Sequence, residues 1–323
     1  MTQSSNTSKT SNTQSKSSPS TIQFDTFSAL LETCNTMQCS IADAALNAEV
    51  QHSDVSREDI LQRMDGILTQ MEATIEAGIQ SQEPSVSGLS GGDATRLMAY
   101  LNQHHHADEQ FKAPVLSPMA IRLMAYGVAT LEENARMKRI VACPTAGGSG
   151  SVPAVLIALE HEHGVSREQT IQGLLTAGCV GNITSQRMHL SGASAGCQAE
   201  VGVASGMAAA GMVEALGGSP SQVLVAAAIS MQNLMGLVCD PVAGLVEIPC
   251  VLRNGLSAIQ SVGAASMAMA GITSFIPIDD VVDAMAHVGR LMPHQLKETA
   301  EGGLATTETA IKFTEGFYGN KTT

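Results

Sequence analysis

The chain has 323 residues, of which 44% are hydrophobic and only 3% aromatic, and it carries a formal net charge of −13. This length and hydrophobic content predict a globular protein of one or two domains, whose core must be filled by aliphatic residues and the 17 Met because Trp is absent. A strongly acidic chain repels phosphate backbones and anionic lipids, so we expect neither nucleic acid nor a membrane as a partner.

The first 21 residues are rich in Ser, Thr, Asn and Gln and contain no apolar run. This composition predicts a disordered polar tail over residues 1–21 rather than a secretory signal, followed by a folded domain over residues 22–318. Seven Cys in a chain without such a signal indicate a reducing compartment, and we expect a cytoplasmic protein. In that setting, clustered cysteines serve metal binding or catalysis more often than disulfides.

The N-terminal part of the folded domain has the apolar spacing of helices, most clearly over residues 59–77. Ser56 and Asp59 match the start of a capping box, which predicts that a helix begins there. Asp93 closes a Gly-rich loop and is expected to cap a helix over residues 94–101.

The middle of the chain, residues 143–271, alternates Ala-rich helical segments with Gly-containing turns and shows no strand pattern. The uncharged stretches 215–239 and 254–278 are long enough to cross a membrane. Gly, Pro and polar residues interrupt them, however, which favours buried core helices. One more amphipathic helix is expected around residues 281–291. We therefore predict an all-α fold with Gly-rich loops between its helices.

Three of the seven cysteines, Cys197, Cys239 and Cys250, are each flanked by Gly or Pro within a few residues. Gly lets the backbone approach a ligand closely, and loop amides can donate hydrogen bonds to cluster sulfur. A cubane iron–sulfur cluster usually takes four cysteines, so three would leave one iron open to bind a substrate oxygen as a Lewis acid. The alternative interpretation is three buried free thiols, because Cys is among the most buried residue types.

At these cysteines the sequence resembles the iron–sulfur-dependent L-serine dehydratases. The spacing of the three residues looks like the ligand pattern of that family, and the likeness runs from about residue 25 to residue 317. It is to the catalytic α subunit of the two-chain form. The most similar strings are residues 85–93, 144–148, 196–202 and 236–247.

The resemblance implies that residues 22–318 form a catalytic domain holding a [4Fe–4S] cluster on Cys197, Cys239 and Cys250. It also implies the dehydration and deamination of L-serine to pyruvate and ammonia, a reaction of amino-acid degradation and gluconeogenesis. Because nothing in this chain resembles the β-domain of single-chain members, the resemblance implies a separate β subunit as partner.

The Gly-rich loop over residues 144–153 offers a place for the substrate carboxylate. If a helix begins after it, an anion can be bound by backbone amides and hydroxyls of Thr145, Gly147, Gly148 and Ser149. A plain helix-start turn is the alternative. Arg253 is a second candidate to hold the carboxylate, with a surface ion pair as its alternative. His189 is a candidate catalytic base by residue type, and the β subunit is the other possible source of a base.

Pyridoxal phosphate is excluded as the cofactor, because no Lys for a Schiff base lies between Arg139 and His294. Three other interpretations stay open. One is a lyase that resembles the cysteine desulfidases, on the same scaffold. The others are a non-catalytic metal protein with zinc on the same cysteines, and a helical interaction protein with buried thiols. Residues 187–189 depart from the family pattern, which leaves threonine and cysteine open as substrates beside serine.

Overall fold

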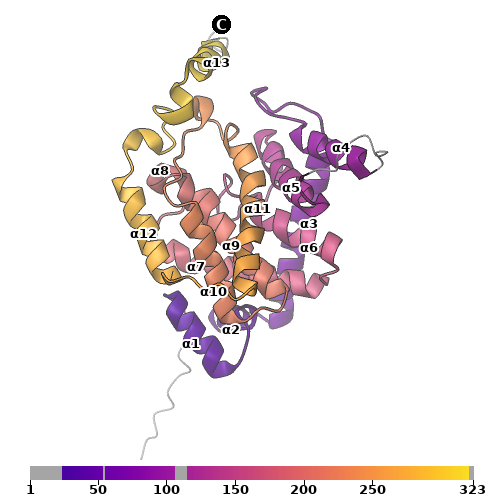
Figure 1. The fold of residues 1–323 in the computed structure, drawn as a ribbon, viewed down its shortest axis with the longest axis vertical. Helices are drawn as coiled ribbons and strands as arrows, with labels where there is room; N and C mark the ends of the chain where they lie inside the picture. The colour runs from indigo at the N-terminus through magenta and orange to yellow at the C-terminus, as the bar shows by residue number, and fades with distance from the viewer. Residues whose placement is uncertain (1–23, 54, 106–114, 320–323) are drawn as a thin grey trace, which may run out of the picture.

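The computed structural model describes residues 24–53, 55–105 and 115–319. In these residues the chain forms thirteen α-helices and no strand, which confirms the all-α prediction (Figure 1). The predicted tail, residues 1–21, lies outside the described residues. The helices are α1 (Phe27–Met37), α2 (Ile41–Ser53), α3 (Arg57–Gln80), α4 (Asp93–His105), α5 (Pro118–Ala135), α6 (Ser151–His163), α7 (Arg167–Arg187), α8 (Gly192–Ala195), α9 (Val203–Ala215), α10 (Pro220–Asn233), α11 (Cys250–Met269), α12 (Ile278–Leu291) and α13 (Glu308–Gly319).

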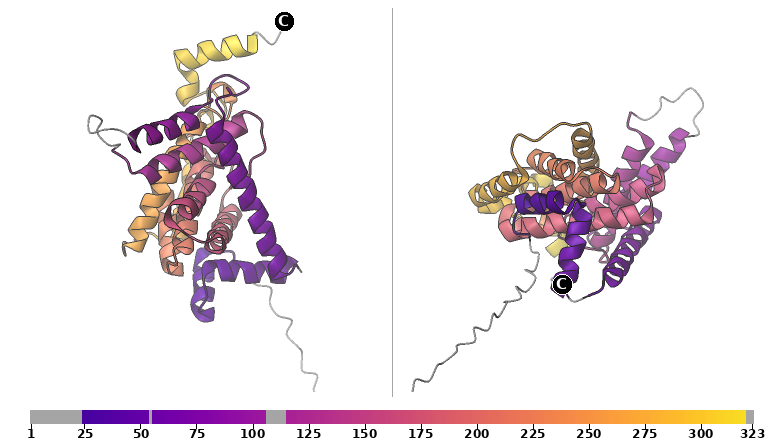
Figure 2. Two further views of the ribbon diagram at one scale, coloured as in Figure 1. Left: turned by 90° about the vertical axis from the view of Figure 1, so that its right-hand side faces the viewer. Right: turned by 90° about the horizontal axis from the view of Figure 1, so that it is seen from below.

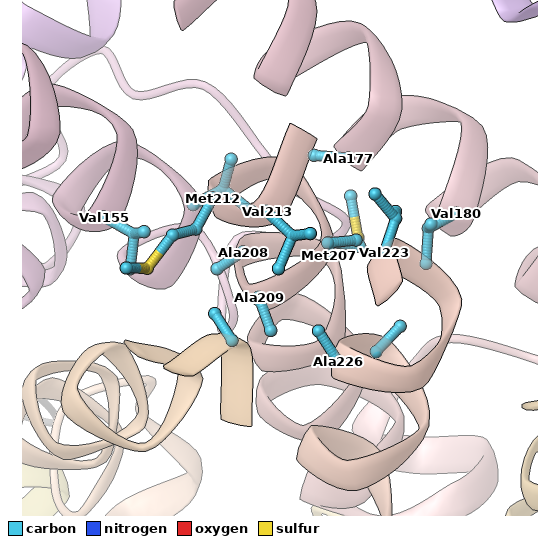
Figure 3. Close-up of a cluster of buried hydrophobic side chains, with 14 of the residues drawn as sticks. Val155, Ala177, Val180, Met207, Ala208, Ala209, Met212, Val213, Val223 and Ala226 are labelled. Carbon is cyan, nitrogen blue, oxygen red and sulfur yellow. The ribbon is translucent and has the colours of Figure 1, made fainter. Parts of the chain in front are cut away.

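Helix α9 forms the centre of the core, and every one of its residues is buried. It packs against α6, α7, α10 and α11 (Figure 1). Small residues let these neighbours come close: a Cβ on Gly211 would lie 2.7 Å from the carbonyl oxygen of Gly173 on α7. Short aliphatic side chains and Met therefore fill the space that aromatic residues occupy in other cores. Figure 3 shows this packing, with the labelled side chains Val155, Ala177, Val180, Met207, Ala208, Ala209, Met212, Val213, Val223 and Ala226.

The predicted helix start at Ser56 is confirmed. Its side chain accepts a hydrogen bond of 3.1 Å from the backbone N–H of Asp59, and α3 begins at Arg57. Asp93 differs from the prediction, because it is the first residue of α4 rather than its cap. The backbone N–H of Asp93 has no acceptor within α4, since it lies in the first turn. It donates instead to Oε1 of the buried Glu132 on α5, at 2.8 Å.

The two long uncharged stretches hold α10 and most of α11, and both helices pack against α9. Helix α11 differs from the predicted buried core helix, because Leu252, Leu256 and Met267 lie exposed on its outer face. Helix α10 begins with a full capping box, in which Ser219 and Gln222 each bond the other's backbone N–H. No helix in the described part of the chain is long and apolar enough to cross a membrane.

The C-terminal part holds two helices where the sequence predicted one. Helix α12 matches the expected amphipathic segment, and α13 follows after two short 3₁₀ turns. Helix α13 lies at the end of the molecule opposite α1 (Figures 1 and 2), and Ala310 is its one buried residue. The hydroxyl of Tyr318 ties α13 to the loop before α11, by donating to the carbonyl of Ala243 at 3.0 Å.

Candidate active site

Cys197, Cys239 and Cys250 come together from three separate turns. Cys197 lies between α8 and the π-helix η1 (Gln198–Gly202), Cys239 lies in the loop after α10, and Cys250 begins α11. All three are buried and free of disulfides. Burial raises the pKa of each thiol, to about 11 for Cys197 and to about 12 for Cys250. Burial raises the pKa of Cys239 most, and the charges of its neighbours raise it further; these are Cys197, Glu200, Glu298 and Cys250, in that order.

Gln198 joins the turn of Cys197 to the loop of Cys239. Its backbone N–H donates to the carbonyl of Leu237 at 2.9 Å, and its side-chain oxygen accepts from the N–H of Gly236 at 2.9 Å. The side chain is fully buried. A buried amide with these partners fixes the relative position of the first two cysteines.

The chain after α12 passes directly beside Cys239. The N–H of Cys239 donates to the carbonyl of Leu296 at 2.9 Å, and the N–H of Glu298 donates to the carbonyl of Cys239 at 2.8 Å. Asp240 extends this pairing, because its Oδ2 accepts from the N–H of Leu304 at 2.9 Å. This C-terminal segment is therefore part of the wall of the site.

Arg253, the predicted carboxylate ligand, is engaged within the protein. Its guanidinium donates to the carbonyl of Val238 at 2.9 Å and pairs with Asp240 at 3.0 Å. Its positive charge lowers the pKa of Cys197, against the larger effect of burial. These contacts hold the loop of Cys239 against α11, and a direct contact of Arg253 with substrate stays a prediction.

Asn254 connects the third cysteine to the Gly-rich loop before α6. Its amide group donates to the carbonyl of Gly147 at 2.7 Å and to that of Cys250 at 3.0 Å. Its side-chain oxygen accepts from the N–H of Gly150 at 2.9 Å. The side chain is fully buried, so these bonds are shielded from water. Sequence analysis missed Asn254, although a polar residue one turn after Cys250 was a visible signal.

Glu200, also missed, faces Cys239 from the π-helix. Its Oε2 lies 4.0 Å from Sγ of Cys239, and its Oε1 accepts a 2.7 Å hydrogen bond from the hydroxyl of Thr145. Ligand atoms of Glu200, Cys239 and Glu298 all lie within 4.8 Å of one another. Burial raises the pKa of Glu200, and the charge of Glu298 adds to that shift. Glu200 was visible in the sequence as an acid three residues after Cys197.

The predicted substrate loop lies against Glu200. Thr145 contacts its carboxylate, and a Cβ on Gly147 would come within 3.1 Å of the same group. A Cβ on Gly148 would lie 2.7 Å from the carbonyl oxygen of Glu200. Ser149 is fully buried, and its hydroxyl donates to the carbonyl of Ala146 at 2.8 Å. The loop therefore lies against Glu200, and the hydroxyl of Ser149 is bonded within the turn.

The segment before α8 holds two of the polar residues considered from the sequence. His189 is exposed, and Arg187 forms ion pairs with Asp279 at 3.1 Å and Asp283 at 2.7 Å of α12. Arg187 thus joins α7 to α12. A catalytic role for His189 stays a prediction.

Comparison with known proteins settles the family. A family model described as serine dehydratase alpha chain matches residues 36–305. The chain belongs to this family.

Two serine dehydratase alpha chains match this one over nearly their whole length. The probable L-serine dehydratase alpha chain of Bacillus subtilis is 44% identical, over 90% of this chain and 94% of the relative. The L-serine dehydratase alpha chain of Peptoniphilus asaccharolyticus is 38% identical, over 89% and 96%. The L-serine dehydratase of Mycobacterium tuberculosis is also 38% identical, but this chain covers only 59% of it.

The chemistry of these three cysteines fits an iron–sulfur cluster. Three thiols buried together are costly to ionise, and a metal that binds thiolates offsets that cost. Soft sulfur ligands suit iron–sulfur clusters. Helix α8 also packs tightly against Cys239, because a Cβ on Gly192 would lie 2.7 Å from Sγ of Cys239. Cys197, Cys239 and Cys250 are therefore the residues that would hold the cluster.

Proposed function

We propose that the chain is the catalytic α subunit of an L-serine dehydratase, which converts L-serine to pyruvate and ammonia. In this proposal a [4Fe–4S] cluster is bound by Cys197, Cys239 and Cys250. The observation that carries it is the convergence of three buried thiols from separate turns. The relatives named as L-serine dehydratases support the choice of substrate.

When bound, such a cluster supplies an iron with an open position, a Lewis acid that can polarise the hydroxyl lost in the reaction. The chain's own residues shape the space around that position. The loop of Thr145, Gly147 and Gly148 lies beside Glu200 and is proposed to border the substrate, with Ser149 holding its turn. Arg253 is proposed to position the loop of Cys239.

A separate β chain is proposed as partner. The relatives that this chain spans almost completely are named alpha chains, whereas the Mycobacterium tuberculosis relative is much longer than the matched region. We further propose a cytoplasmic location and a place in amino-acid degradation that feeds gluconeogenesis, since the free thiols suit a reducing compartment.

The test is an anaerobic assay of the reconstituted enzyme, with and without its β chain. Pyruvate release from L-serine is measured beside sulfide release from L-cysteine. The proposal predicts pyruvate from L-serine, lost after brief exposure to air and lost in Cys239→Ser. The matched control is Cys179→Ser, since Cys179 lies on α7 outside the site. Turnover of L-cysteine instead of L-serine would identify a desulfidase-like lyase and overturn the proposed substrate.

A further inference from the structure

Two carboxylates from distant parts of the chain meet beside Cys239. Glu200 comes from the π-helix that follows Cys197, and Glu298 comes from the segment after α12. Their oxygens and Sγ of Cys239 lie within 4.8 Å of one another. Both side chains are partly exposed, so a small molecule from solvent can reach them.

Specific contacts hold the carboxylate of Glu200 and the backbone of Glu298. Glu200 is oriented by the hydroxyl of Thr145, at 2.7 Å. Glu298 has a left-handed backbone, with φ of 63°, and its N–H donates to the carbonyl of Cys239 at 2.8 Å. Residues other than Gly rarely adopt that conformation, so the backbone pairing with Cys239 has to stabilise it. Strain of this kind is typical of functional positions.

The pair lacks a neutralising cation. Within the described segments, neither Glu200 nor Glu298 forms an ion pair with Lys, Arg or His. The nearby Arg253 already donates to Val238 and Asp240. A cluster bound by three thiolates carries a net negative formal charge, so it does not supply the missing positive charge either. Two ionised carboxylates this close repel each other, and a cation bound between them relieves that repulsion.

A glycine lets the backbone of α8 lie directly against the pair. A Cβ on Gly192 would lie 2.7 Å from Oε2 of Glu200 and 3.2 Å from Oε2 of Glu298. It would also lie 2.7 Å from Sγ of Cys239. The backbone of α8 thus comes directly against all three groups, which a larger residue would prevent.

We propose that Glu200 and Glu298 together bind the α-ammonium group of the amino-acid substrate. This inference rests on the proposed function, because it takes the substrate to be a hydroxy amino acid bound beside the three cysteines. The ammonium group is the one cation that such a substrate brings, and it can donate hydrogen bonds to both carboxylates. The pair then selects amino acids over hydroxy acids that lack the amino group.

The test compares two compounds on the anaerobic cluster-loaded enzyme with its β chain. L-Serine has the ammonium group, and 3-hydroxypropionate keeps the carboxylate and the hydroxyl without it. Binding of each is read from the change in the visible absorption of the cluster, and KM for L-serine is measured separately. The variants are Glu200→Gln and Glu298→Gln. Glu301→Gln is the control, because Glu301 is exposed in the same segment and pairs only with His294.

The inference predicts that each site variant weakens L-serine binding and raises its KM by about 10- to 100-fold, the effect of losing one charge-assisted hydrogen bond. Binding of 3-hydroxypropionate stays the same or tightens, and the iron content stays at the wild-type level. Equal losses for both compounds would show a structural role and overturn the inference. Loss of iron in the variants would show metal ligation and overturn it as well. An inactive, iron-free wild type would instead overturn the proposed function itself.

Discussion

The side-chain amide of Asn254 on α11 donates a 2.7 Å hydrogen bond to the carbonyl of Gly147. This bond fixes the loop before α6 against the helix that begins with Cys250. The same side chain bonds the N–H of Gly150 and the carbonyl of Cys250. One fully buried amide thus sets the distance between the loop that contacts Glu200 and the third cysteine.

Replacing Asn254 is therefore expected to damage both stability and the site. Asn254→Ala removes the partner of the buried N–H of Gly150 and of the buried carbonyl of Gly147, which should lower the free energy of unfolding by about 2–4 kcal/mol. Urea unfolding under anaerobic conditions measures this loss. Asn233→Ala is the matched control, because Asn233 is exposed and bonds only the carbonyl of Ile229. Equal stability of the two variants would contradict the role given to Asn254.

Gly192→Ala tests whether the close packing of α8 against Cys239 is needed to bind iron. The added Cβ would lie 2.7 Å from both Sγ of Cys239 and Oε2 of Glu200, so one of these groups must move. We expect a folded protein that retains much less iron than the wild type. Circular dichroism and iron analysis measure the two properties.

The control for that variant is Gly263→Ala on α11, where a Cβ would meet nothing within 4 Å. Ala is a better helix former than Gly, so this change should stabilise the fold by about 0.5–1 kcal/mol and leave iron content unchanged. Wild-type iron content in Gly192→Ala would contradict the prediction, because the residues around Cys239 would then accommodate the added methyl group without loss of the metal.

Glu214 gives a prediction for pH. This residue is buried in α9, accepts a hydrogen bond from the N–H of Ala42 at 3.2 Å, and has its pKa raised from 4.5, mainly by burial. The folded state holds the carboxyl proton of Glu214 more tightly than the unfolded state does. This protonation therefore stabilises the fold fully below pH 4.5, and the stabilisation is lost as the pH rises through the raised pKa of Glu214.

As the pH rises through this window, the free energy of unfolding of the wild type should therefore fall relative to that of Glu214→Gln. At higher pH the difference between the two proteins should stay constant. Urea unfolding of both proteins between acidic and neutral pH measures the difference. A parallel pH dependence of wild type and Glu214→Gln would mean that Glu214 is not the group responsible.

The sequence predicted the parts of the site that residue type and local setting determine. Cys197, Cys239 and Cys250 stand out by their Gly and Pro neighbours, and the family spacing separates them from the other four cysteines. Helix starts such as Ser56 were predictable because capping is a local interaction. The all-α class follows from the helical apolar spacing in the same way.

The missed features depend on contacts between distant segments. Glu200 and Glu298 meet only because backbone bonds hold the segment after α12 against Cys239. Helix α13 was missed in a region where a single helix was expected, and it is joined to the body through the contact of Tyr318 with Ala243. The ion pair of Arg253 with Asp240 was also missed, because no local pattern indicates it.

The central claim, that three cysteines hold a cluster with an open iron, is tested most directly by iron and sulfide analysis of the anaerobically prepared chain. The account predicts a brown protein with about four irons and four sulfides per chain. It predicts that Cys250→Ala loses the cluster and that Cys179→Ala keeps it. A colourless wild type that holds zinc or no metal, or a Cys250→Ala variant with full iron content, would contradict it.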